Sequence, residues 1–374
     1  MLPDISLLHD VRNCDIQSNL LPSLPRIRLL HETRNMDFKH NTIVREGLQE
    51  LRRRLPPGWS AKPQDGTTVE VAAPDRRTGA IVLEARARLA PKDVLPLADR
   101  LVEGRETPVV VAPFLTENTR ARLRERDVGY LDLTGNARIV LPEPGLFIET
   151  QGASEDPNRE ERPARSLRGA KAGRVVRALI ELKTPPGVRE LAALTKIDAG
   201  YVSRVLSFLD SEALITRVGR GRIESVDWPA LLRRWAQEAP LDARGRLRTF
   251  LEPRGLTAFQ ARLAKFDGLY AITGSLAAAT LAPVAPARLA TVWIPDVNAA
   301  ATSLALRPAD VGANVVLAEA LDDTVFEGVV QRDGLWYAAP TQVAVDLLTS
   351  PGRGPQEGEE LIDWMKTNED PWRR

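Results

Sequence analysis

The sequence predicts a protein of mixed α/β and α+β class with several domains, and three observations lead to this prediction. The chain of 374 residues is longer than one hydrophobic core normally serves. Strand and helix patterns alternate in residues 36–150 and again in 241–374, whereas 171–238 contains helical patterns followed by one hairpin. Residues 151–170 are polar, contain prolines and carry both charge signs, so they are typical of a linker.

Composition and charge are ordinary for a globular protein in water. The apolar fraction is 43%, the charged fraction is 27% and the net charge is +1. No apolar run approaches the roughly 20 residues that cross a bilayer, and the N-terminus lacks the pattern of a signal peptide. We therefore expect a cytoplasmic protein with no membrane contact.

The N-terminal stretch differs in composition from the rest of the chain. Residues 1–35 contain no alanine or glycine, and Cys14 and all three histidines lie within the first 40 residues. We expect residues 1–35 to be a disordered extension, or sequence upstream of a natural start at Met36 that precedes a helix over 41–55. One cysteine excludes an internal disulfide, and the spacing matches no zinc site, so we expect no metal and no cofactor.

Residues 171–238 contain three helical patterns, at 173–183, 188–196 and 201–214, and then a hairpin pattern. The third helix has an apolar stripe formed by Val202, Val205, Leu206, Leu209 and Leu214. Its other side carries Tyr201, Ser203, Arg204 and Ser207. Two short strands, Ile215–Val218 and Arg222–Val226, flank a Gly-Arg-Gly tip, and the hairpin carries Arg217, Arg220 and Arg222. Three helices followed by a basic hairpin predict a winged helix-turn-helix.

The charge distribution favours a nucleic-acid partner for this segment. Between Arg165 and Trp235 there are 14 Lys and Arg against 7 Asp and Glu, although the whole chain is only +1. A basic island on a nearly neutral chain is what phosphate binding requires. Arg168 and Lys171, at the basic end of the linker, are expected to contact the DNA backbone or, alternatively, to be solvated. The alternative for the whole segment is a winged helix that binds protein.

We therefore predict a sequence-specific regulator that binds double-stranded DNA and is associated with the nucleoid. In this prediction Tyr201, Ser203, Arg204 and Ser207 read bases in the major groove. The hairpin residues Arg217, Arg220 and Arg222 hold the phosphate backbone. Since the chain offers one such module, binding to a palindromic operator requires a homodimer.

The N-terminal segment, 36–150, has the predicted order α-β-β-α-β-α-β. This order resembles the restriction-endonuclease-like fold of the PD-(D/E)XK nucleases, whose acids on adjacent strands bind a divalent cation. The resemblance places the acids at Glu70 and Glu84, with Arg86 where the family has lysine. It implies an inactive nuclease-like scaffold, and the enzyme alternative is a Mg²⁺-dependent nuclease. A further alternative is that Glu84 and Arg86 form an ion pair on one face of a strand.

The C-terminal segments YAITGSLAAATLAPV and DLLTSPGRGPQEGEELIDWM, together with the strand that ends at Pro295, resemble the C-terminal domain of AbiEi-type antitoxins. The resemblance covers about residues 171–370. These antitoxins are transcriptional repressors of toxin–antitoxin operons, so it implies a repressor with a cognate toxin as partner. In that family the winged helix usually comes first in the chain, which leaves open a stand-alone regulator of similar architecture.

The step Gly274-Ser275 also resembles nucleotidyltransferases, in which a Gly-Ser turn is followed by a strand with two aspartates. The corresponding strand here offers only Asp296, so we predict a nucleotidyltransferase-like domain without catalytic activity. A last polar group, in GYLDLTGNARI, consists of Tyr130, Asp132, Thr134 and Asn136. These residues are predicted either to line a site or to stabilise a turn.

Overall fold

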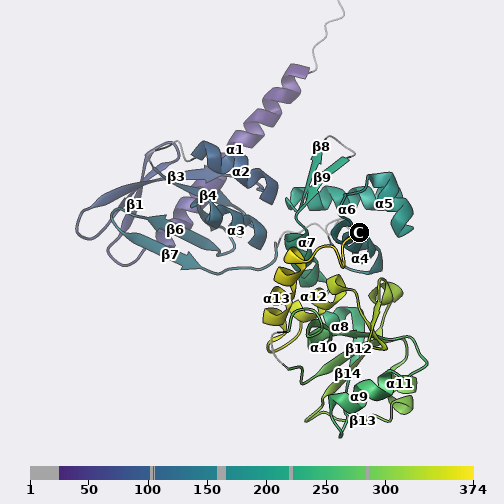
Figure 1. Ribbon diagram of the computed structural model, residues 1–374. Coiled ribbons are helices and arrows are strands. Elements are labelled where there is room, and N and C mark those ends of the chain that lie inside the picture. The colour runs from purple at the N-terminus through teal and green to yellow at the C-terminus, as the bar shows by residue number, and fades with distance from the viewer. Residues whose placement is uncertain (1–24, 102–103, 105, 158–165, 219–221, 284–285) are drawn as a thin grey trace, which may run out of the picture. The chain divides into compact units, whose positions relative to one another are not determined.

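The computed structural model describes residues 25–101, 104, 106–157, 166–218, 222–283 and 286–374. The chain divides into two compact units (Figure 1). The N-terminal unit contains Met1–Leu89 and Pro96–Asp156, and the C-terminal unit contains Ala90–Leu95 and Pro157–Arg374. Both units combine helices with a mixed sheet, as the sequence predicted. The segments 171–238 and 241–374 lie together in the C-terminal unit.

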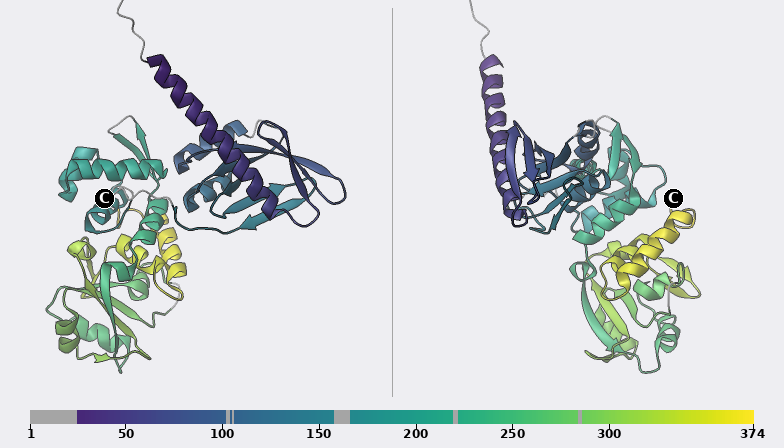
Figure 2. Two further views of the ribbon diagram at one scale, coloured as in Figure 1. Left: turned by 180° about the vertical axis from the view of Figure 1, so that it is seen from behind. Right: turned by 90° about the vertical axis from the view of Figure 1, so that its left-hand side faces the viewer.

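The N-terminal unit is a sheet covered on both faces. Its strands follow one another in chain order from β1 to β7, and β3, β4 and β5 are parallel while the other neighbours are antiparallel. Two crossovers in the same direction place α2 and α3 on one face, and α1 lies across the other (Figure 2). The strands are β1 (Ser60–Asp65), β2 (Thr68–Ala72), β3 (Thr78–Ala85), β4 (Thr107–Ala112), β5 (Gly129–Asp132), β6 (Ala137–Leu141) and β7 (Leu146–Thr150), and the helices are α1 (Pro25–Arg54), α2 (Pro91–Leu101) and α3 (Glu117–Glu125).

Two features of this unit differ from the sequence prediction. Helix α1 begins at Pro25 and not near Asn41, so part of the predicted extension is helical. Proline is tolerated in the first turn, and no glycine interrupts the helix before Gly47. At Gly47 the helix lies so close to the sheet that a Cβ atom would be 2.6 Å from Val111 Cγ1. Strand β1 was not predicted, because only Ala61 of its residues is buried.

The C-terminal unit consists of a helix–hairpin subdomain (residues 166–238) and a sheet subdomain (residues 239–374) that share one hydrophobic core. The helix–hairpin subdomain contains α4 (Ala170–Glu181), α5 (Val188–Thr195), α6 (Ala199–Ser211), β8 (Ile215–Val218), β9 (Arg222–Val226) and α7 (Trp228–Glu238). The hairpin strands are at the predicted residues, and all five apolar residues of the predicted stripe, from Val202 to Leu214, are buried.

The sheet subdomain has the strand order β13-β10-β14-β12-β11-β16-β15. Helices α10, α12 and α13 pack on one another, and α12 also contacts α4 and α7 of the helix–hairpin subdomain. The strands are β10 (Gly245–Leu251), β11 (Ala271–Thr273), β12 (Ala290–Ile294), β13 (Arg307–Pro308), β14 (Val315–Ala320), β15 (Val330–Arg332) and β16 (Leu335–Tyr337). The helices are α8 (Leu241–Arg244), α9 (Leu256–Leu263), α10 (Gly274–Ala278), α11 (Val297–Ser303), η1 (Asp323–Phe326), α12 (Pro340–Leu348) and α13 (Gly354–Thr367).

A buried arginine on α4 joins the two subdomains. The guanidinium of Arg177 donates to Glu181 Oε1 from Nε (3.0 Å) and Nη2 (2.9 Å). It also donates to the backbone oxygens of Thr324 and of Glu327, the latter at 2.7 Å. Glu181 Oε1 accepts a further hydrogen bond, at 2.6 Å, from the hydroxyl of Thr341 on α12. The charge of Arg177 is therefore both paired and hydrogen-bonded across the junction, as burial of an ion requires.

A second buried pair lies beneath α7. Asp346 of α12 is fully buried and accepts hydrogen bonds from Thr273 Oγ1 (2.6 Å), Trp293 Nε1 (2.7 Å) and Gln342 Nε2 (2.8 Å). Arg244 forms an ion pair with the same carboxylate. Its guanidinium carbon lies 5.7 Å from the ring centroid of Trp293. Asp346 thus binds three elements of the sheet subdomain to α12.

Removal of the Asp346 carboxylate should strongly destabilise the C-terminal unit. Asp346→Ala leaves the buried charge of Arg244 and three buried donors without their acceptor, which costs about 3–5 kcal/mol in the free energy of unfolding. Urea denaturation measures this loss. The control is Asp363→Ala, which removes an exposed carboxylate that pairs only with Lys366 at the surface. Equal unfolding midpoints for the two variants would contradict the role of Asp346.

Candidate nucleic-acid interface

Helix α6 and the β8–β9 hairpin lie at the end of the C-terminal unit that is remote from the sheet subdomain, with α4 and α7 between them (Figures 1 and 2). Helix α5 ends at Lys196 in the left-handed conformation (φ 55°), and Asp198 then caps α6 by accepting a hydrogen bond from the backbone N–H of Tyr201 at 3.0 Å. Helix α6 has 13 residues and is therefore about 20 Å long. Helices α5 and α6 with the turn between them therefore form a helix–turn–helix. Asp210, near the end of α6, forms an ion pair at 3.0 Å with Lys92 of the segment Ala90–Leu95, which belongs to the same unit.

The predicted base-reading residues differ in their exposure. Arg204 and Ser207 are exposed, whereas Tyr201 and Ser203 are half-buried. The hydroxyl of Ser207 donates to the backbone oxygen of Ser203 at 2.9 Å, so its proton is used within the helix. The guanidinium carbon of Arg204 lies 5.8 Å from the ring centroid of Tyr201. Burial raises the pKa of the Tyr201 phenol, and the charge of Arg204 opposes that rise in part.

The hairpin is anchored by apolar residues and presents polar ones. Ile215 and Ile223 are buried against the core, while Thr216 and Arg222 are exposed. Arg217 is half-buried. Arg220 belongs to the tip 219–221, which lies outside the described residues. The described part of the hairpin therefore offers Arg222 as its exposed cation.

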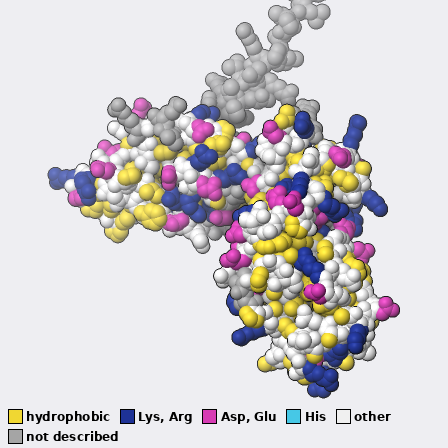
Figure 3. Space-filling model, in the orientation of Figure 1, with side chains coloured by type: hydrophobic (Ala, Val, Ile, Leu, Met, Phe, Trp, Pro, Cys, Tyr) yellow, Lys and Arg dark blue, Asp and Glu magenta, His cyan; other side chains and the backbone are white. Residues whose placement is uncertain are grey.

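Apart from Arg217, which is half-buried, the described basic side chains of the helix–hairpin subdomain fall into two groups. One group is ion-paired, with Arg174–Glu327 at 2.7 Å, Arg177–Glu181 at 2.9 Å, Arg233–Glu359 at 2.5 Å, Arg234–Glu238 at 2.6 Å and a further pair between Lys183 and Asp370. Among the described residues, the following have no carboxylate within ion-pair distance: Arg168, Lys171, Arg189, Lys196, Arg204 and Arg222. All six are exposed. Lys and Arg side chains project from this subdomain in Figure 3.

Four of these six cations were predicted as DNA contacts, and two were not. Arg189 lies in the first turn of α5, and Lys196 lies at its end, next to α6. Both belong to the basic island of the sequence, but neither lies on the third helix, on the hairpin or at the basic end of the linker, where DNA contacts were predicted. Their positions at the two ends of α5 are the signal that could have identified them.

The segment that leads into α4 is held by Glu238 of α7. This carboxylate accepts hydrogen bonds from the backbone N–H of Leu167 at 2.6 Å and from the hydroxyl of Ser166 at 2.8 Å. Burial raises the pKa of Glu238, but the charge of Arg234 and these hydrogen bonds outweigh burial, so the pKa lies below its ordinary value of 4.5. Glu238 thereby positions the backbone of Arg168, whose N–H donates to the Ser166 hydroxyl at 3.1 Å.

The acids predicted for a cation site in the N-terminal unit do not meet. Glu70 pairs in register with Ala80 on β3, and Glu84 lies four residues further along that strand. Four residues of strand span about 13 Å, which is too far for two carboxylates to hold one ion. Glu84 Oε1 instead lies 2.5 Å from Arg86 Nη2, which is the ion pair given above as the alternative.

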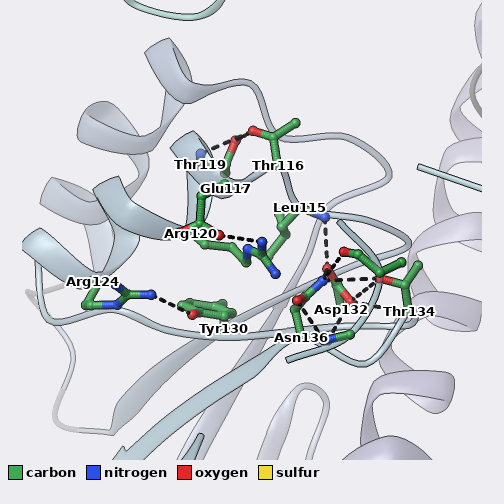
Figure 4. Close-up of polar contacts among 12 residues, drawn as sticks. Leu115, Thr116, Glu117, Thr119, Arg120, Arg124, Tyr130, Asp132, Thr134 and Asn136 are labelled. Carbon is green, nitrogen blue, oxygen red and sulfur yellow. Dashed lines mark hydrogen bonds and ion pairs between the residues drawn. The ribbon is translucent and has the colours of Figure 1, made fainter. Parts of the chain in front are cut away.

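The polar group around Asp132 stabilises a turn (Figure 4). Asp132 is fully buried at the end of β5 and accepts hydrogen bonds from the backbone N–H groups of Leu115 (3.1 Å), Thr134 (3.0 Å) and Asn136 (3.0 Å). It also accepts from the Thr134 hydroxyl (2.7 Å) and the Asn136 amide (2.9 Å). Tyr130 lies apart from this group, with its hydroxyl 3.3 Å from Arg124 Nη2. Since Asp132 is saturated by the protein itself, the turn alternative accounts for it.

The Gly274-Ser275 step and Asp296 lie at different ends of their strands. In the antiparallel pair of β11 and β12, Thr273 is opposite Thr291, so Gly274 follows at the beginning of β12, whereas Asp296 comes after its last residue, Ile294. Asp296 caps α11 by accepting from the backbone N–H of Ala299 at 3.0 Å. In the part of the chain that the structure describes, no group of three or more His, Cys, Asp or Glu is placed to hold a metal ion.

No protein-family model matches the chain, and no curated protein and no solved structure is significantly similar to it. Among the described helices, none combines the length and the apolar character needed to span a membrane. The arrangement of α4 to α7 and the hairpin is therefore the feature from which a function can be argued.

The contribution of Glu238 to stability should depend on pH. Its folded-state pKa lies below the ordinary value of 4.5, so its stabilisation is fully present above that pH and is lost as the pH falls through the folded-state pKa. Glu238→Gln should therefore lower the free energy of unfolding at pH 7 by about 1–2 kcal/mol, after allowance for solvent screening. The difference from wild type, measured by urea unfolding, should shrink below pH 4.5.

The matched control is Glu360→Gln, which neutralises an exposed carboxylate on α13 and should change stability little at either pH. A difference between Glu238→Gln and wild type that stayed constant across this pH range would contradict the assignment.

Proposed function

We propose that the C-terminal unit binds double-stranded DNA, with the helix–hairpin subdomain acting as a winged helix-turn-helix. Helix α6 enters the major groove, and the β8–β9 hairpin lies against the phosphate backbone. The observation that supports this proposal most is the division of the basic side chains. Those turned toward the protein are paired with carboxylates. Six others are exposed and have no carboxylate of the described residues within ion-pair distance: Arg168, Lys171, Arg189, Lys196, Arg204 and Arg222.

Unpaired exposed cations favour a polyanionic partner for an energetic reason. A lysine or arginine that already has a carboxylate partner must give up that pair to contact a phosphate, whereas an unpaired one replaces only water and releases counterions from the DNA. Six such residues within one subdomain predict an affinity for DNA that falls steeply as the salt concentration rises. The apolar stripe of α6 faces the core, so it is not part of the surface that would meet DNA, whereas Leu194 of α5 and Val218 of the hairpin are exposed.

The biological role that we propose is that of a sequence-specific transcriptional regulator. The resemblance of residues 171–370 to AbiEi-type antitoxins suggests a repressor, and a cognate toxin is then the protein partner to look for. A homodimer would present two copies of α6 to a palindromic operator. We assign no catalytic role to the N-terminal unit, because Glu70 and Glu84 are four register positions apart.

A gel-shift titration at low salt with random-sequence duplex tests the proposal. Wild-type protein should bind, and the affinity should fall as the salt concentration rises. Arg222→Ala should weaken binding to all duplexes alike and lower the slope of log K against log salt by about 1, since it removes one phosphate contact.

Arg233→Ala is the charge-matched control. It removes the same charge from a residue that is paired with Glu359, so it should leave binding and the salt slope nearly unchanged. Absence of any duplex binding by the wild-type protein at low salt would refute the proposed function. Equal effects of the two substitutions would refute the role of the hairpin.

A further inference from the structure

We infer that Arg204 selects a guanine at one position of the bound duplex and that Tyr201 is the positioning residue that orients Arg204 for this contact. The inference rests on the proposed function, because it assumes that α6 lies in the major groove. It adds a base identity to the site and distinguishes Arg204 from the other exposed cations, which bind phosphates.

The side chain of Arg204 runs back along α6 toward the beginning of the helix. Its Nη1 atom lies 3.7 Å from the place where a Cβ atom of residue 200 would stand, and that residue is glycine. The guanidinium therefore lies over the first turn of α6, and the Asp198 carboxylate that caps the helix lies on the same turn, with Oδ1 at 3.0 Å from that Cβ position. In helix-turn-helix proteins the N-terminal part of the recognition helix is the part that contacts base edges.

Tyr201 restricts the guanidinium from one side. Its ring centroid lies 5.8 Å from Arg204 Cζ, within the range of a cation–π contact. The ring is itself half-buried, so only part of it is in contact with water. An arginine that is held in place before docking loses less side-chain entropy when it binds, which favours a contact that depends on orientation.

Among the polar side chains of α6, Arg204 is the principal candidate to donate hydrogen bonds to a base. It is the only basic residue in α6, and no described carboxylate lies within ion-pair distance of it. The proton of the Ser207 hydroxyl is already donated to Ser203, and Ser203 is half-buried. A guanidinium donates two parallel hydrogen bonds to O6 and N7 of guanine, a pair of acceptors that no other base presents in the major groove.

The test is selection of duplexes from a randomised library, followed by affinity measurements with each base at the selected position. For wild-type protein we expect a preference for guanine of about 5- to 150-fold at one position. Arg204→Ala should abolish this preference. Arg222→Ala, which removes the same charge from the hairpin, should weaken all duplexes alike and keep the preference.

Substitutions of Tyr201 test the positioning role. Tyr201→Phe keeps the ring and should keep the guanine preference, whereas Tyr201→Leu removes the ring and should reduce the preference while binding to random duplex persists. If Arg204→Ala weakened every sequence equally, or if Tyr201→Leu and Tyr201→Phe behaved alike, the inference would be overturned. Those results would leave DNA binding intact, whereas failure of wild-type protein to bind any duplex would remove the proposed function itself.

Discussion

The C-terminal unit depends on two arginines that are largely removed from solvent, with 3% of the Arg177 side chain and 11% of the Arg244 side chain exposed. Arg177 and Arg244 each carry a charge into the interior, where an ion without a partner is very unfavourable. Their partners come from both subdomains: Glu181 and the backbone around η1 for Arg177, and Asp346 for Arg244. Because these hydrogen bonds are directional, Arg177 and Glu181 fix α4 on η1 and α12, and Arg244 fixes the end of α7 by donating to the backbone oxygen of Ala239 at 2.7 Å. The orientation of α6 and the hairpin follows from that attachment.

The same residue type therefore has two uses in this unit. Arginine is suited to buried pairs because its planar fork matches a carboxylate and its charge persists at any physiological pH. On the junction with the sheet subdomain, Arg174 and Arg233 have carboxylate partners. On the remote side, Arg204 and Arg222 have none among the described residues. The subdomain is strongly basic in sequence, yet only part of that charge is available to a ligand. The available part lies at the start of α4, at the two ends of α5, on α6 and on the hairpin.

Local patterns predicted the features that depend on local geometry. The apolar stripe of α6 and the strands of the hairpin are where the sequence placed them, since periodicity and turn residues determine both. Long-range features were less accessible. The register of β2 on β3 decides that Glu70 and Glu84 are far apart, and no pattern within either strand reveals it. The partial burial of Tyr201 is also a long-range feature, because it depends on which side chains from elsewhere in the chain pack against α6.

The polar side chains of this protein differ in whether other groups of the protein already fill their hydrogen-bonding capacity. A carboxylate has about four acceptor sites, and Asp132 and Asp346 each fill theirs with donors of the protein. Such groups hold turns and helices together and have no capacity left for a ligand. Arg204 is the opposite case, since its side chain is exposed, lies 5.8 Å from the ring of Tyr201 and has no described carboxylate within ion-pair distance. The donors of such a side chain remain available to an acceptor outside the protein.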